Sequence, residues 1–119
     1  MSETFKWCKD KTRLAIWDKQ VFCVNRVGDK CWHLNGQLHR ENGPAFECAN
    51  GNKAWYLNGK CHREDGPAIE YVDGTKYWHL NDRLHRENGP AVENASGNKS
   101  WYLNGYHYSE SDYWKELNK

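Results

Sequence analysis

The sequence has almost no net charge and no long apolar run, and these two absences narrow the possible functions. In its 119 residues, 17 Lys and Arg stand against 16 Asp and Glu, a formal charge of +1. Nucleic-acid-binding proteins usually carry a basic excess, so we expect no binding to nucleic acid through bulk charge. No apolar stretch approaches the roughly 20 residues that a membrane-spanning helix needs, so no membrane span is expected.

The cysteines follow neither a disulfide framework nor a metal-binding spacing. Their number is odd, and no two of them are spaced as C-x-x-C. Residues 1–13 also lack the apolar centre of a secretory signal peptide. These absences predict reduced thiols, no metal or other cofactor, and a cytoplasmic protein. The five are Cys8, Cys23, Cys31, Cys48 and Cys61.

Aromatic residues are abundant although the chain is hydrophilic. The mean hydropathy is -1.08, yet the chain holds 7 Trp, 7 Tyr and 3 Phe. Disordered chains are poor in aromatics, so this composition indicates a folded protein. It predicts a thin structure held together by a few large side chains.

The chain repeats itself with a period of 23 residues. The second copy of the repeated stretch reads WYLNGKCHREDGPA, at residues 55–68. Lys, Leu and Gly positions keep the same register from copy to copy. Such self-similarity is typical of stacked repeat architectures. The structural ladder that it predicts is Trp32, Trp55, Trp78 and Trp101.

Each copy contains the pattern of a β-hairpin. Ala49-Asn50-Gly51 fits a three-residue loop with glycine in the left-handed conformation. That loop places Glu47 opposite Lys53, an opposite-charge cross-strand pair. It also places Ala45 opposite Trp55. The same register pairs Glu70 with Lys76 and Glu93 with Lys99.

The two ends differ from the repeats and are expected to cap them. We divide the one domain into N-terminal cap strands at 1–20, repeats at 21–108, and a C-terminal capping helix at 109–119. Leu14–Trp17 is expected to be a strand, and Phe22 to lie opposite Trp32. Ser109-Glu110-Ser111-Asp112 carries N-cap and capping-box chemistry, followed by Tyr113, Trp114 and Leu117 on one helix face.

The 23-residue period, with an aromatic strand followed by Asn-Gly and His, resembles the MORN repeat family over about Val21 to Tyr108. The variant WYLNGxxHREDGPA is similar to divergent MORN-like repeats of bacterial, bacteriophage and giant-virus proteins. The resemblance implies an all-β fold: a single-layer twisted antiparallel sheet of stacked hairpins that scaffolds protein contacts or, in some members, associates with lipid. The strand Lys53–Leu57 departs from the family's usual Tyr-x-Gly-x-Trp, and the near-zero charge gives lipid binding no support.

The His-Arg-Glu loops are the strongest candidates for chemistry. Because the set recurs three times almost unchanged, it lacks the single differentiated pocket of a catalytic site. Equivalent imidazoles lie two strands apart, about 10 Å, which is too far for one zinc ion. We therefore expect no catalytic residue and no metal site. Instead Arg and Glu are expected to bridge adjacent repeats while His closes the turn.

Two surfaces are candidates for partner binding. With the Trp and Leu ladder as the core, the opposite face carries aromatic residues, and a row of arginines adjoins it. Aromatics and arginine are enriched in protein interfaces. The candidate partner-binding residues are Arg40, Arg63, Arg86, Tyr56, Tyr71 and Tyr102.

The favoured hypothesis is a non-enzymatic protein-binding module that scaffolds or inhibits a partner protein, with homo-oligomerisation left open. The resemblance to bacteriophage repeats suggests inhibition of a host enzyme. The alternative is a protein that sequesters a small, nucleotide-like ligand with its His-Arg-Glu loops, which a basic concave pocket would favour. A small enzyme built on one loop is the third hypothesis.

Overall fold

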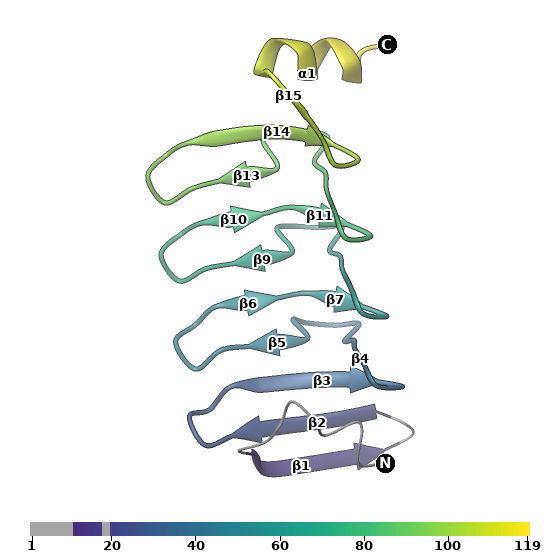
Figure 1. The fold of residues 1–119 in the computed structure, drawn as a ribbon, viewed down its shortest axis with the longest axis vertical. Helices are drawn as coiled ribbons and strands as arrows, with labels where there is room; N and C mark the ends of the chain where they lie inside the picture. Colours follow the sequence, from purple (N-terminus) through teal and green to yellow (C-terminus); the bar gives the residue numbers. More distant parts are fainter. Residues whose placement is uncertain (1–10, 18–19) are drawn as a thin grey trace. The chain divides into compact units, whose positions relative to one another are not determined.

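The computed structural model describes residues 11–17 and 20–119, and it consists of short antiparallel strands followed by a helix (Figure 1). The all-β fold of stacked hairpins with a short C-terminal helix, expected from the repeats, is confirmed. The elements are β1 (Lys11–Trp17), β2 (Gln20–Asn25), β3 (Lys30–Leu34), β4 (Gln37–Leu38), β5 (Phe46–Glu47), β6 (Lys53–Ala54), β7 (Tyr56–Leu57), β8 (Lys60–Cys61), β9 (Ile69–Glu70), β10 (Lys76–Tyr77), β11 (His79–Leu80), β12 (Arg83–Leu84), β13 (Val92–Glu93), β14 (Lys99–Leu103), β15 (Tyr106–Tyr108) and α1 (Glu110–Leu117).

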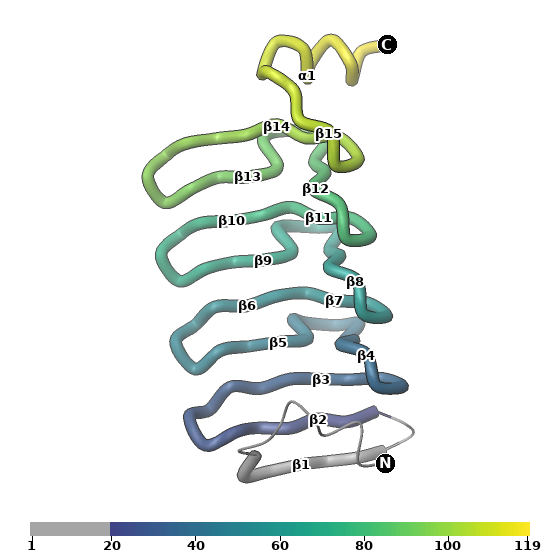
Figure 2. Tube along the Cα trace, in the orientation of Figure 1, coloured from purple at the N-terminus to yellow at the C-terminus, as the bar shows by residue number. Residues whose placement is uncertain are grey.

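The chain divides into two compact units, which we call the N-terminal unit, ending at Lys60, and the C-terminal unit, beginning at Cys61. In the N-terminal unit, strands pair in the order β1-β2-β3-β5-β6. In the C-terminal unit, the order is β9-β10-β13-β14-β15 (Figure 2). All these pairings are antiparallel, so each unit is a single layer of successive hairpins.

The cross-strand registers follow the charge pattern of the sequence. Glu47 lies opposite Lys53 in the β5–β6 hairpin, as predicted, and opposite Lys30 of β3 on its other side. Each glutamate of this kind therefore has a lysine partner position on a neighbouring strand, which favours this register over a slipped one. Phe22 lies opposite Trp32, with ring centroids 4.9 Å apart. The other predicted pairs are also present: Glu70 with Lys76, and Glu93 with Lys99.

Two kinds of tight turn fix the hairpins. The three-residue loop closes with a hydrogen bond from Cys48 N to Asn52 O of 2.8 Å, and Gly51 has φ +105°. In the Asn-Gly turn, Asn58 (φ 52°) and Gly59 (φ 81°) are both left-handed. Two consecutive left-handed residues are the requirement of a type I′ turn, which is why Asn-Gly occurs here.

The third copy makes the same turn with Asn81-Asp82 in place of Asn-Gly. Asp82 adopts φ 71°, a left-handed conformation that most side chains avoid. Its carboxylate Oδ1 accepts a hydrogen bond of 3.0 Å from the Cys61 backbone N–H. This contact offsets part of the conformational cost of having no glycine at this position.

The fully buried side chains are mostly small, and the predicted tryptophan core needs correction. Ala45, Ala68 and Ala91 are fully buried, whereas all four ladder tryptophans are only half-buried. Ala91 is buried because its backbone is hydrogen-bonded on both sides. Its carbonyl oxygen accepts from Trp78 N, and its N–H donates to Ser100 O, each at 2.8 Å. Each ladder tryptophan instead keeps part of its surface exposed.

The expectation of reduced thiols is wrong for one pair. Cys23 and Cys31 occupy directly opposite positions on β2 and β3, with Cα atoms 5.6 Å apart, and form a disulfide. This separation is typical of disulfide-linked residues. Cys48 and Cys61 are free thiols, and Cys8 lies outside the described residues.

The C-terminal helix α1 is anchored by its cap and by one tyrosine. Ser109 Oγ accepts a hydrogen bond of 3.2 Å from Asp112 N, which confirms the predicted N-cap. Tyr113 is fully buried; its hydroxyl donates to Arg86 O and accepts from Gly89 N. The helix packs against β14 and β15. Across the described residues, no helix combines the length and apolar character needed to cross a bilayer.

Candidate functional site

A groove of about 760 Å³ lies in the C-terminal unit between two successive His-Arg-Glu loops. Trp78 and Leu80 contribute apolar side chains to it, and the loop residues 63–66 and 85–88 line the rest. A smaller groove of about 430 Å³ in the N-terminal unit is lined by Trp32, Leu34 and loop residues 39–42. The repeat therefore builds the same kind of groove in each unit.

The arginine of each loop is held in place by the fold. Arg86 stacks on Trp78, with Cζ 3.8 Å from the ring centroid. Its Nη1 donates to Pro90 O and to Glu93 Oε2, both at 3.0 Å, and its Nε donates to Asn88 Oδ1 at 3.2 Å. A planar guanidinium can stack and donate at once, which a lysine ammonium cannot do.

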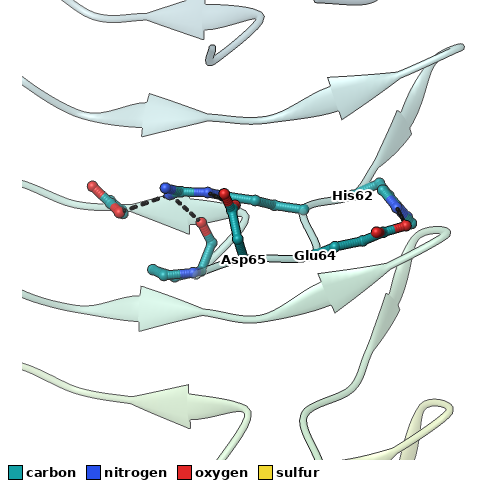
Figure 3. A network of polar contacts seen from close by, with 6 residues as sticks. His62, Glu64 and Asp65 are labelled. Atoms are coloured by element: carbon teal, nitrogen blue, oxygen red, sulfur yellow. Dashed lines mark hydrogen bonds and ion pairs between the residues drawn. The ribbon is translucent and has the colours of Figure 1, made fainter. Parts of the chain in front are cut away.

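Arg63 makes the corresponding contacts in the preceding loop (Figure 3). Its Nη1 donates to Pro67 O and Glu70 Oε2, both at 3.1 Å, and its Nε donates to Asp65 Oδ1 at 3.0 Å. A Cβ built on Gly66 would lie 2.9 Å from Arg63 Cζ. A side chain at the glycine of the Gly-Pro step would therefore displace the guanidinium from its position.

The first loop uses the same arrangement with fewer bonds. Arg40 stacks on Trp32 at 3.8 Å and donates from Nη1 to Pro44 O at 3.1 Å and to Glu47 Oε2 at 3.3 Å. In every copy the arginine binds a glutamate seven residues ahead, inside its own 23-residue copy. These arginine–glutamate hydrogen bonds therefore do not join adjacent copies of the repeat, as was predicted, but lie within one copy.

Histidine makes the link between successive copies. His62 Nδ1 accepts a hydrogen bond of 3.0 Å from Asn81 N in the next copy, and its Nε2 lies 3.3 Å from Glu64 Oε2. An Nδ1 that accepts from a backbone N–H carries no proton, so the proton is on Nε2 and is donated to the glutamate. The other two copies repeat this: His39 with Asn58 and Glu41, and His85 with Asn104 and Glu87.

The charges exposed at the groove are mainly negative. The side chains of Glu64, Asp65 and Glu87 are 82%, 88% and 74% exposed, whereas those of Arg63 and Arg86 are 23% and 22% exposed. In Figure 3, Glu64 points toward His62, and Asp65 lies on the other side of the loop, beside the arginine. A ligand entering the groove meets carboxylates before it meets guanidinium groups.

None of the three predicted tyrosines lines either groove. In β14, Tyr102 lies between Trp101 and Leu103, so strand alternation places it on the opposite face from both. Its ring lies 5.0 Å from that of His107. Tyr71 is exposed at the tip of the β9–β10 hairpin. Tyr56 is half-buried and is the first residue of β7, directly after Trp55 in the sequence.

The free thiols and the half-buried imidazole of His79 have pKa values that burial shifts. Burial, reinforced by Asp82, raises the pKa of Cys61 to about 12, so this thiol is protonated at neutral pH. Burial raises the pKa of Cys48 as well, with Asp29 adding to the shift. Burial lowers the pKa of His79, against a smaller opposing effect of the Asp82 carboxylate. Within the described residues, no group of His, Cys, Asp and Glu is arranged to hold a metal ion.

Comparisons of the chain with protein-family models, curated proteins and solved structures found no match. The resemblance to MORN repeats consequently stays a prediction from the sequence.

Proposed function

We propose that this protein is a non-enzymatic binding module that holds a partner protein in the groove over Trp78, scaffolding or inhibiting that partner. The observation that carries the proposal is the groove itself, with an apolar Trp78–Leu80 surface between two polar loops. Apolar area flanked by polar groups is the composition of protein interfaces.

The hydrogen bonds of the loop histidines support a binding function over a catalytic one. Each loop histidine uses Nδ1 to accept from the backbone and Nε2 to contact a glutamate. A general base needs a nitrogen that is able to reach substrate. The imidazoles are engaged in joining copies of the repeat, which supports a structural role for them.

The groove's charge also favours a protein partner over the alternative, a nucleotide-like ligand. Phosphate recognition relies on arginine donors that face the ligand. In the groove, Nη1 and Nε of Arg86 already donate to Pro90, Glu93 and Asn88. The exposed side chains beside them are carboxylates, which repel phosphate.

A blocking substitution tests the proposal. Asn88→Trp would place a large side chain in the groove, and Asn98→Trp would place the same side chain at an exposed hairpin tip. Each variant, with the wild type, is used to capture a partner from a native extract, and its unfolding is checked by chemical denaturation. We expect Asn98→Trp to retain the partner and folded Asn88→Trp to lose it. Retention by both variants would contradict the proposed site.

A further inference from the structure

The groove combines an apolar surface with an acidic rim, a combination that suits side chains with an apolar stem and a positive charge. Trp78 and Leu80 offer apolar area, while Glu64, Asp65 and Glu87 present carboxylates at its edge. Lysine and arginine side chains pair an aliphatic stem with a cationic head. A stem lying on Trp78 would bring its head within reach of these carboxylates.

The internal ion pairs decide the sign of the charge that a ligand meets. Arg63 donates to Glu70 and Asp65, and Arg86 donates to Glu93, so both guanidinium charges are offset inside the fold. The exposed carboxylate of Glu64 contacts the imidazole of His62, whose hydrogen-bond pattern is that of the neutral ring.

We propose that the groove between the second and third His-Arg-Glu loops takes an extended, lysine- or arginine-rich segment of the partner protein. Its cationic heads bind Glu64 and Glu87 through charge-assisted hydrogen bonds. Its stems pack on Leu80 and on the part of Trp78 that the stacked Arg86 guanidinium leaves exposed. The proposal rests on the proposed function and adds the chemistry of the partner.

Peptides of matched length test the charge preference. Three peptides carry Lys, Gln or Glu at alternate positions, and their binding to the full chain is followed by fluorescence anisotropy at several salt concentrations. We expect the lysine peptide to bind at least about tenfold more tightly than the glutamine peptide, a difference of about 1.4 kcal/mol. The preference should shrink as salt screens the carboxylates.

A charge-matched pair of variants locates the interaction. Glu64→Gln/Glu87→Gln removes two groove carboxylates while keeping an oxygen that can accept from each histidine. Glu110→Gln/Asp112→Asn removes two exposed carboxylates from the first turn of α1. We expect the first variant to lose about tenfold in affinity for the lysine peptide and the second to bind like wild type.

Three results would overturn this proposal. The first is equal binding of the lysine and glutamine peptides, and the second is equal binding by both double variants. The third is self-association of the wild type, in sedimentation velocity, that Glu64→Gln/Glu87→Gln abolishes, because the occupant would then be a second copy of the chain. If Asn88→Trp still loses the native partner, only the partner chemistry is wrong; if it retains the partner, the proposed function fails too.

Discussion

Replacing Arg86 by alanine removes the side chain that joins the groove to the sheet. Besides a hydrogen bond to the exposed Asn88 amide, the lost contacts are a partly exposed ion pair with Glu93, a donation to Pro90 O, and stacking on Trp78. The ion pair contributes about 1 kcal/mol, the charged hydrogen bond about 1.5 and the stacking about 0.5–1. Release of the ordered side chain returns about 1 kcal/mol of entropy. We therefore expect Arg86→Ala to lower the free energy of unfolding by about 2 kcal/mol.

Urea denaturation followed by tryptophan fluorescence measures this loss. With an m-value of about 2 kcal/mol/M, the midpoint should fall by about 1 M. Arg83→Ala is the matched control, because Arg83 is an exposed arginine on β12 and its replacement should change stability by less than about 0.5 kcal/mol. Equal midpoints for the two variants would refute the assignment of arginine to the structure of the loop.

Three further predictions concern the effect of burial on a tyrosine hydroxyl, a histidine and two cysteine thiols. Tyr113→Phe removes both hydrogen bonds of a buried hydroxyl and should cost about 1–3 kcal/mol in thermal denaturation, whereas Tyr106→Phe, at an exposed ring, should cost nothing measurable. Burial lowers the pKa of His33 below its ordinary 6.5, so the unfolded chain binds this proton first. Stability should be full above pH 6.5 and should decline as the pH falls below it, and His33→Leu should show a shallower decline. Iodoacetamide at neutral pH should label Cys48 and spare Cys61, whose pKa is about 12; mass spectrometry showing equal labelling would contradict this.

Local patterns explain why the hairpins could be predicted from the sequence. The Glu47–Lys53 pair and the loop that ends at Gly51 fix each other's register over only a few residues. The same register that placed Phe22 opposite Trp32 also places Cys23 opposite Cys31. Cysteine spacing along the chain does not predict this disulfide, because the two residues become neighbours only across paired strands.

The site depended on contacts that sequence proximity does not reveal. Glu64 and Asp65 both follow Arg63 closely and are both expected to bind its guanidinium. Asp65 does so, but the carboxylate of Glu64 contacts His62 instead. The carboxylate that binds Arg63 Nη1 is Glu70, seven residues ahead on β9. The size and period of the tryptophans favour a core position, but alanines take the tightest positions, and Trp32 and Trp78 line grooves.

The indole N–H resonance of Trp78 provides the most direct test of a binding groove. Each tryptophan gives one such signal in a ¹H–¹⁵N spectrum of the full chain, and Trp78→Phe identifies the one in question. During titration with the lysine peptide, we predict that the Trp78 signal shifts and that the signal of Trp114, exposed on α1, stays in place. A Trp78 signal that does not move while the peptide binds would contradict the central claim that partners dock in this groove.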